Sequence, residues 1–102
     1  MPNEEALRFL GLLNRGGKCL IGEPILHNMR KGNALVIAET DSKTALRVKE
    51  KGERVGCLIL EGASKEELGE AIGFLSASAI LVKDTKASLA LARKWETRKG
   101  DL

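Results

Sequence analysis

Three short apolar runs, each of the length of one β-strand, constrain the fold of this chain more than any other feature. They span residues 34–38, 57–60 and 79–82, and in each of them four or five apolar residues follow one another without a polar residue. A strand that is apolar on both faces is typical of a sheet covered on both sides by helices. The intervening segments have helical patterns, so the sequence predicts an α/β domain.

Helical segments precede and separate these runs. From Glu4 to Asn14 the apolar residues recur at the spacing of one helix face, and the pair Gly16–Gly17 ends the pattern. Residues 18–21 are then a short strand candidate. Pro24 suits the first turn of a second helix, because its missing N–H would have no helical partner there. We expect that helix to stop near Gly32.

Three further helices are predicted from their N-terminal capping residues. Asp41 or Ser42 can cap a helix that runs to about Arg54. Ser64 and Glu67 have the spacing of a capping box, in which each side chain accepts from the backbone N–H of the other residue. Asp84 is the expected cap of the last helix.

The order of these elements predicts a three-layer α/β/α sandwich around a four-stranded, mostly parallel mixed sheet. The short strand that begins at Lys18 suits an edge of the sheet and is the candidate to run antiparallel. A length of 102 residues fits one domain, expected to span residues 1–102 with an ordered core of about 4–98.

Composition indicates a cellular location but does not decide between functions. No apolar run approaches the roughly 20 residues that span a bilayer, and acids stand where a signal peptide carries positive charge. Cys19 and Cys57 lie inside apolar runs, which favours two reduced, buried thiols and a cytoplasmic location. The net charge of +3 permits nucleic-acid binding without requiring it.

The sequence carries no recognisable catalytic or cofactor motif. Residues 16–19 lack the first glycine and the hydroxyl of a phosphate-binding loop. His27 is the only histidine, so a multi-histidine metal site is excluded, and no carboxylate pair suggests acid–base chemistry. We therefore expect a non-enzymatic protein without a cofactor or a metal.

A glycine-rich segment with basic residues is the first candidate binding region. Residues 14–23 include Arg15 and Lys18, and Gly22 stands just before the second helix. Glycine there allows close approach by a phosphate backbone, which the two cations could also contact. The alternative is that these glycines only form turns.

The same segment resembles a known family. Residues 9–18 followed by Ile21-Gly22-Glu23, then residues 35–39 with Asp41-Ser42, and then residues 67–73 are similar to small bacterial members of the L-seven-Ae/L-thirty-e ribosomal protein family. The resemblance covers roughly residues 5 to 93 and follows the element order of the family. It implies an α/β/α sandwich and a ribosomal-protein-like RNA-binding function, directed to the sharp bends called kink-turns.

The resemblance also implies where RNA would bind. Contacts come from the start of the second helix and from the loop before the last strand. With the phosphate contacts expected from the basic side chains, the RNA-binding residues would be Arg15, Lys18, Gly22, Glu23, Pro24, Asn28, Lys31, Leu75, Ser76, Ala77 and Ser78.

Three positions depart from the pattern of strong kink-turn binders. Pro24 and Ile25 stand where those proteins place polar side chains that read G·A pairs, and Asn28 stands at the place of a lysine. Two hypotheses follow: a protein that recognises structured RNA, of ribosomal or other kink-turn type, or a family member that has lost the RNA site and acts as a protein-interaction scaffold.

Overall fold

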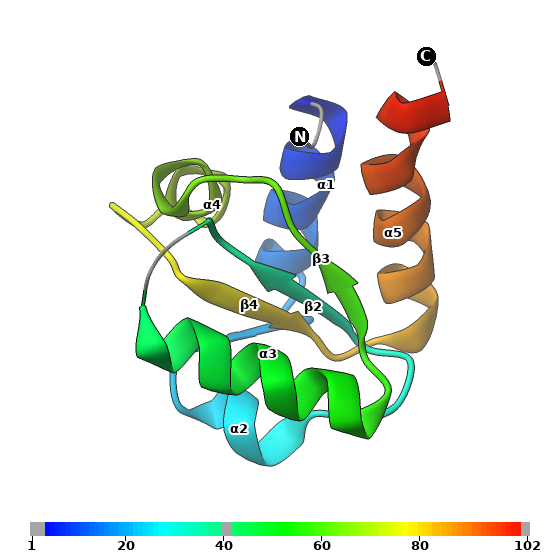
Figure 1. Ribbon diagram of the computed structural model, residues 1–102. Helices are drawn as coiled ribbons and strands as arrows, with labels where there is room; N and C mark the ends of the chain where they lie inside the picture. The colour runs from blue at the N-terminus through cyan, green and yellow to red at the C-terminus, as the bar shows by residue number, and fades with distance from the viewer. Residues whose placement is uncertain (1–3, 40–41, 101–102) are drawn as a thin grey trace.

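The computed structural model describes residues 4–39 and 42–100, the last five by their backbone alone. Helices and strands alternate along the described chain in the predicted order (Figure 1). The elements are α1 (Glu4–Arg15), β1 (Cys19–Ile21), α2 (Pro24–Asn28), β2 (Ala34–Ile37), α3 (Lys43–Val55), β3 (Leu58–Leu60), α4 (Lys65–Ile72), β4 (Ala79–Val82) and α5 (Thr85–Gly100). None of the described helices is long and apolar enough to cross a membrane.

The four strands form one mixed sheet in the order β1-β4-β2-β3. β2 pairs with β3 in parallel, whereas β4 pairs antiparallel with both β1 and β2. Three strands therefore point the same way, and β1 lies at an edge as predicted. The strand that opposes the others is β4, not the edge strand, so only one of the three strand pairs is parallel.

Helices cover both faces of the sheet, which confirms the predicted sandwich. In Figure 1, α1, α4 and α5 lie on one side of the sheet, and α2 and α3 lie on the other. Strand β4 shows how both faces are used: Ile80 packs with the side chains of α1, α4 and α5, and Leu81 packs with those of α2 and α3. Both residues are fully buried, and burial of such a side chain contributes about 1.5–3 kcal/mol.

The predicted helix caps are present. The hydroxyl of Ser42 accepts from the N–H of Ala45 at 3.4 Å, while Asp41 lies outside the described residues. Ser64 and Glu67 form the capping box, with bonds of 3.0 and 2.9 Å. The α5 helix is capped by Asp84 and continues to Gly100.

Helix α2 is shorter than the predicted span to Gly32. It ends at Asn28, because Met29 has an extended backbone with ψ of 133°. The ammonium of Lys51, on α3, donates to the carbonyl of Leu26 and so satisfies an acceptor in the last turn of α2. The chain then turns toward β2 through residues 29–33.

Candidate nucleic-acid interface

The strand register brings two of the predicted binding segments to one end of the sheet. Ile21 pairs with Ile80, and Ile37 pairs with Ala79. The turn after β1 therefore lies beside the loop that leads into β4, and the N–H of Ala38 donates to the carbonyl of Ser78 at 2.9 Å. We call the group Gly22, Glu23, Pro24, Leu75, Ser76 and Ser78 the carboxyl-end site.

The turn before α2 leaves its backbone open. Gly22 has a φ of +81°, and a Cβ added there would meet only the ring of Pro24, at 4.0 Å. The carbonyl of Gly22 accepts from the N–H of Ile25 at 3.1 Å, which closes the turn. Glu23 is exposed and makes no capping bond with its side chain. A polar ligand can thus approach the turn closely and meet a free carboxylate.

The loop from Gly73 to Ser78 is held against α4. The N–H of Phe74 donates to the carbonyl of Gly69 at 2.7 Å, and the N–H of Ala77 donates to the carbonyl of Lys65 at 2.9 Å. Gly69 is required here, because a Cβ on it would lie 2.4 Å from the Cα of Ser76. The loop is therefore packed along the helix, with its tip directed into solvent at the left of Figure 1.

The tip of this loop exposes two large apolar side chains. Leu75 is 97% exposed and Phe74 is 54% exposed. Phe74 was not among the predicted binding residues. Its position between Gly73 and the predicted residue Leu75 was the available signal, since a glycine that ends a helix often leads directly into an exposed loop.

Three positions that the family resemblance brings into the RNA site have side chains engaged in the core or in their own helix. Ala77 is only 6% exposed, so its methyl group belongs to the core. Ile25 is 1% exposed and packs between the sheet and α3, so it cannot present itself to a ligand. The amide of Asn28 donates to the carbonyl of Pro24 at 2.7 Å, within its own helix.

Arg15, Lys18 and Lys31 do not join the carboxyl-end site. Cys19 pairs with Val82, which places the preceding Lys18 at the opposite end of β1. Lys18 and Gly22 stand four positions apart along extended chain, a distance of about 13 Å. Lys31 follows α2 and precedes β2 at that same opposite end. Arg15 lines a surface groove between α1 and α4. The predicted RNA-binding residues thus lie in at least three places rather than on one surface.

The groove beside Arg15 has a mixed lining. It lies between α1 and α4 and contains two arginines and three glutamates among its polar side chains: Glu4, Arg8, Arg15, Glu67 and Glu70. Because side chains of both signs line it, this groove favours neither an anionic nor a cationic ligand.

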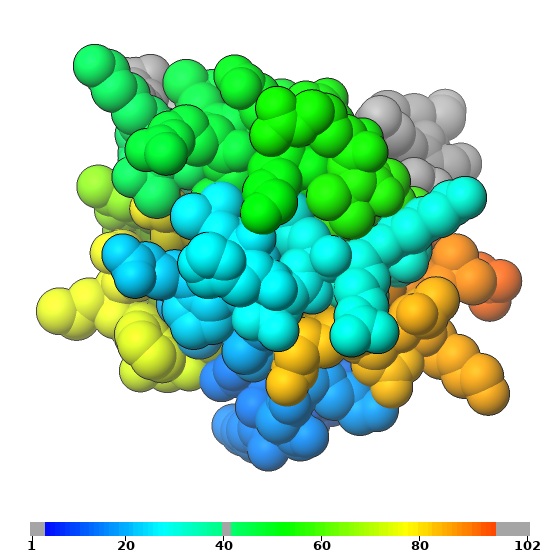
Figure 2. Space-filling view, turned by 90° about the horizontal axis from the view of Figure 1, so that it is seen from below, coloured from blue at the N-terminus to red at the C-terminus, as the bar shows by residue number. Residues whose placement is uncertain are grey.

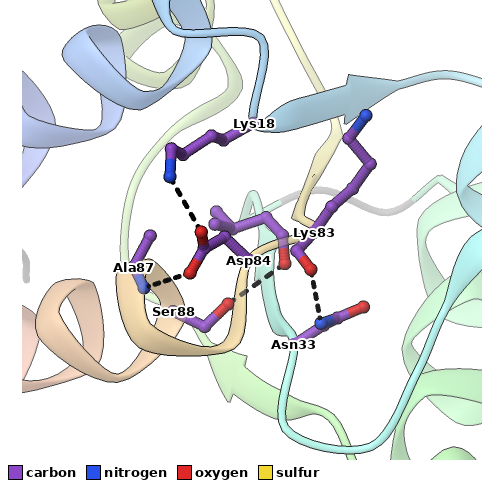
Figure 3. Close-up of polar contacts among 7 residues, drawn as sticks. Lys18, Asn33, Lys83, Asp84, Ala87 and Ser88 are labelled. Carbon is purple, nitrogen blue, oxygen red and sulfur yellow. Dashed lines mark hydrogen bonds and ion pairs between the residues drawn. The ribbon is translucent and has the colours of Figure 1, made fainter.

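A polar network organises the end of the sheet opposite the carboxyl-end site (Figure 3). The buried hydroxyl of Ser88 accepts from the N–H of Ala34 at 2.8 Å and donates to the carbonyl of Val82 at 3.0 Å. The buried amide of Asn33 donates to the carbonyl of Lys83 at 3.1 Å. These bonds join the start of β2, the end of β4 and the first turn of α5.

The two thiols are not activated. Burial raises the pKa of Cys19 to about 11, although the charge of Lys83 opposes the shift. Burial also raises the pKa of Cys57. Both are free thiols of intermediate burial, less enclosed than predicted, and a protonated thiol is a poor nucleophile. In the part of the chain that the structure describes, no group of three or more His, Cys, Asp or Glu side chains could hold a metal ion.

Comparisons with known proteins support the fold but give no information on the function. No family model and no curated protein matches the chain. A solved structure of a protein with unknown function from Bacillus halodurans C superposes with a TM-score of 0.78 and 21% identity. The match covers 92% of this chain and 99% of that one. At this identity the likeness shows a shared α/β fold.

Proposed function

We propose that this chain is a non-catalytic RNA-binding protein that recognises structured RNA of the kink-turn type through the carboxyl-end site. The observation that carries the proposal is the register of β1 and β4, which brings the turn at Gly22 to the same end of the sheet as the loop that leads from Leu75 through Ser78 into β4. These are the two segments that the family resemblance assigns to RNA contact.

The chemistry of the site suits a bent RNA. Gly22 lets a backbone approach closely, and the carboxylate of Glu23 can accept from the amino groups of exposed base edges. Leu75 can pack against a base that has left the stack, as occurs at bulges and bends. Because Pro24 and Ile25 supply no polar side chain, recognition would depend on shape and backbone more than on side-chain readout.

The test is a titration against a kink-turn RNA and against the same RNA with its G·A pairs replaced. We expect tighter binding of the kink-turn, and we expect Leu75→Ala to reduce that preference by about tenfold, or 1.4 kcal/mol. Leu89→Ala is the matched control, since Leu89 is also exposed, at 48%, but lies on α5. Equal binding of the two RNAs by the unmodified protein would contradict the proposal.

A second candidate function is a protein-interaction module, and the exposure of Phe74 and Leu75 favours it. Adjacent exposed apolar side chains mark many protein–protein contact sites. This candidate predicts equal, weak binding of both RNAs. It also predicts a protein partner whose binding is lost in Leu75→Ala and retained in Leu89→Ala. A cytoplasmic setting suits either function, because both cysteines are free thiols.

A further inference from the structure

Six exposed basic residues gather at the end of the sheet opposite the carboxyl-end site. We call this group the basic rim; it consists of Lys18, Arg30, Lys31, Arg54, Lys83 and Lys86. They come from five places in the chain: the start of β1, the connection from α2 to β2, the end of α3, the end of β4 and the first turn of α5. In Figure 2 the cyan connection and the orange start of α5 lie side by side at the right of the view.

Backbone contacts hold these segments against one another. The N–H of Gly32 donates to the carbonyl of Gly56 at 3.1 Å, which joins the α2–β2 connection to the end of α3. The side chain of Lys31 crosses directly over Gly56, where an added Cβ would lie 3.1 Å from its Cγ. On the other side, an added Cβ on Gly32 would lie 3.4 Å from the methyl group of Thr85, in α5.

One buried amide places two of the basic residues. Asn33 is 2% exposed. Its Oδ1 accepts from the N–H of Arg30 at 3.1 Å, and its Nδ2 donates to the carbonyl of Lys83 at 3.1 Å. The backbones of Arg30 and Lys83 are therefore fixed on either side of one side chain, although these residues lie on different connections. The hydrogen bonds of the fold therefore position these residues of the basic rim.

Most of this positive charge is uncompensated. Lys18 forms an ion pair with Asp84 at 2.8 Å. Among the residues whose side chains the structure describes, no acid lies within ion-pair distance of Arg30, Lys31, Arg54, Lys83 or Lys86. Like charges held together at one end of a fold repel one another, and the phosphates of a nucleic acid relieve that repulsion while releasing counterions.

We propose that the basic rim is a second RNA contact, which binds phosphates of a helical segment flanking the bend held at the carboxyl-end site. The inference rests on the proposed function in one respect, namely that the ligand is RNA. The exposed residues of α2 and its following turn connect the two ends: Pro24, His27, Asn28 and Lys31. An RNA that leaves the first site along α2 would reach the rim.

The rim favours RNA over a membrane surface. Basic surfaces that bind membranes usually add large apolar side chains that enter the lipid. The exposed large apolar residues of the described chain are Leu12, Leu46, Phe74, Leu75 and Leu89. Of these only Leu89, one helical turn after Lys86 on α5, stands near the rim, so the rim offers a cluster of charges with at most one large apolar side chain beside it.

The experiment measures the salt dependence of RNA binding. The double variant Lys31→Gln/Lys83→Gln removes two rim cations and leaves the hydrogen-bonded backbone atoms in place. The matched control is Arg8→Gln/Arg47→Gln, which changes the net charge equally at exposed positions of α1 and α3. Each protein is titrated with the kink-turn RNA and with its G·A-replaced control at several salt concentrations, and urea unfolding verifies that each variant is folded.

The rim variant should bind both RNAs more weakly by the same factor. The slope of the logarithm of its association constant against the logarithm of the salt concentration should fall in magnitude by about 2. The control variant should keep the slope of the unmodified protein. Equal slopes for the two variants would overturn the rim, even if the kink-turn preference were intact. A reduced slope without any kink-turn preference would support the rim and contradict the proposed specificity. Binding to vesicles of anionic lipid but to neither RNA would overturn both.

Discussion

The ammonium of Lys18 lies 2.8 Å from Oδ2 of Asp84, although 66 positions separate the two residues in the sequence. Figure 3 shows Lys18 at the entry to β1 and Asp84 at the start of α5. The other carboxylate oxygen of Asp84 accepts from the N–H of Ala87 at 2.9 Å, so one side chain both caps a helix and holds the edge strand. This pair ties the edge strand β1 to the helix that follows its neighbour β4.

The ion pair predicts a specific pH dependence of stability. The hydrogen bond from Lys18, followed by that from Ala87, holds the pKa of Asp84 below its ordinary value of 3.8. The unfolded chain therefore binds the proton more readily, and the stabilisation is complete above about pH 5 and is lost as the pH falls through the folded pKa. The free energy of unfolding should differ between the protein and its Asp84→Asn variant at neutral pH, and the difference should shrink in acid. A pH-independent difference would refute this explanation.

Ser88→Ala should destabilise the fold through lost hydrogen bonds rather than lost packing. The substitution leaves the buried N–H of Ala34 and the carbonyl of Val82 without their bonds to the hydroxyl. We expect a loss of about 1–3 kcal/mol in the free energy of unfolding, measured by urea denaturation. Ser76→Ala, at an exposed serine, should change it by less than about 0.5 kcal/mol. Equal effects of the two substitutions would contradict the role of Ser88.

Gly69→Ala should disturb the carboxyl-end site from outside it. The added Cβ would lie 2.4 Å from the Cα and 2.5 Å from the N of Ser76, and backbone atoms cannot move aside without shifting the loop. We expect a loss of about 1–3 kcal/mol of stability and weaker kink-turn binding. At Gly16 an added Cβ meets only carbonyl oxygens at 3.6 Å, so Gly16→Ala is the control and should leave both properties unchanged. Unimpaired RNA binding by folded Gly69→Ala would show that the loop position is not important.

The thiol of Cys19 should react slowly in the folded protein. Its pKa is raised to about 11 from an ordinary 9.0, so little thiolate exists near neutral pH. In a Cys57→Ala background, alkylation by iodoacetamide should be much slower than in urea and should accelerate as the pH approaches the folded pKa. The raised pKa also means that stability falls as the pH increases from about 9 to 11. Native and denatured rates that agree near neutral pH would contradict the burial of this thiol.

Local chemistry explains which parts of the fold could be predicted. The capping box of Ser64 and Glu67 and the cap at Asp84 are set by neighbouring residues, and the structure confirms both. The predicted end of α2 near Gly32 was wrong: the helix stops at Asn28, where Met29 turns extended, and its last turn contacts Lys51 of α3, a contact between distant residues that the local sequence does not reveal. The direction of β4 relative to its neighbours could not be predicted, since a uniformly apolar run such as residues 79–82 fits a parallel or an antiparallel pairing equally well.

The proposed binding residues show the same division. Gly22 was predicted as a contact residue because a glycine just before a helix allows a phosphate backbone to approach closely, which can be read from neighbouring residues alone. Lys18 and Gly22 stand at the two ends of the predicted strand 18–21, so their separation was implicit in the sequence. That Lys31 lies at the Lys18 end follows only from strand register, which pairs both Cys19 and Ala34 with Val82. Lys83 and Lys86, which belong to the proposed basic rim, were not predicted because they stand beside Asp84, where they look like the ordinary charged start of a helix.

The most direct test of the proposed RNA site is to follow the backbone amide signals of the ¹⁵N-labelled protein by NMR while a kink-turn RNA is added. The proposal predicts that the signals of Gly22, Glu23, Leu75 and Ser76 shift together, although about 50 positions separate the two segments in the sequence, because the register of β1 and β4 brings the turn after β1 and the loop before β4 to the same end of the sheet. Shifts at these residues that are absent with the G·A-replaced RNA would support the account. Shifts confined to other surfaces, or none at all, would contradict it.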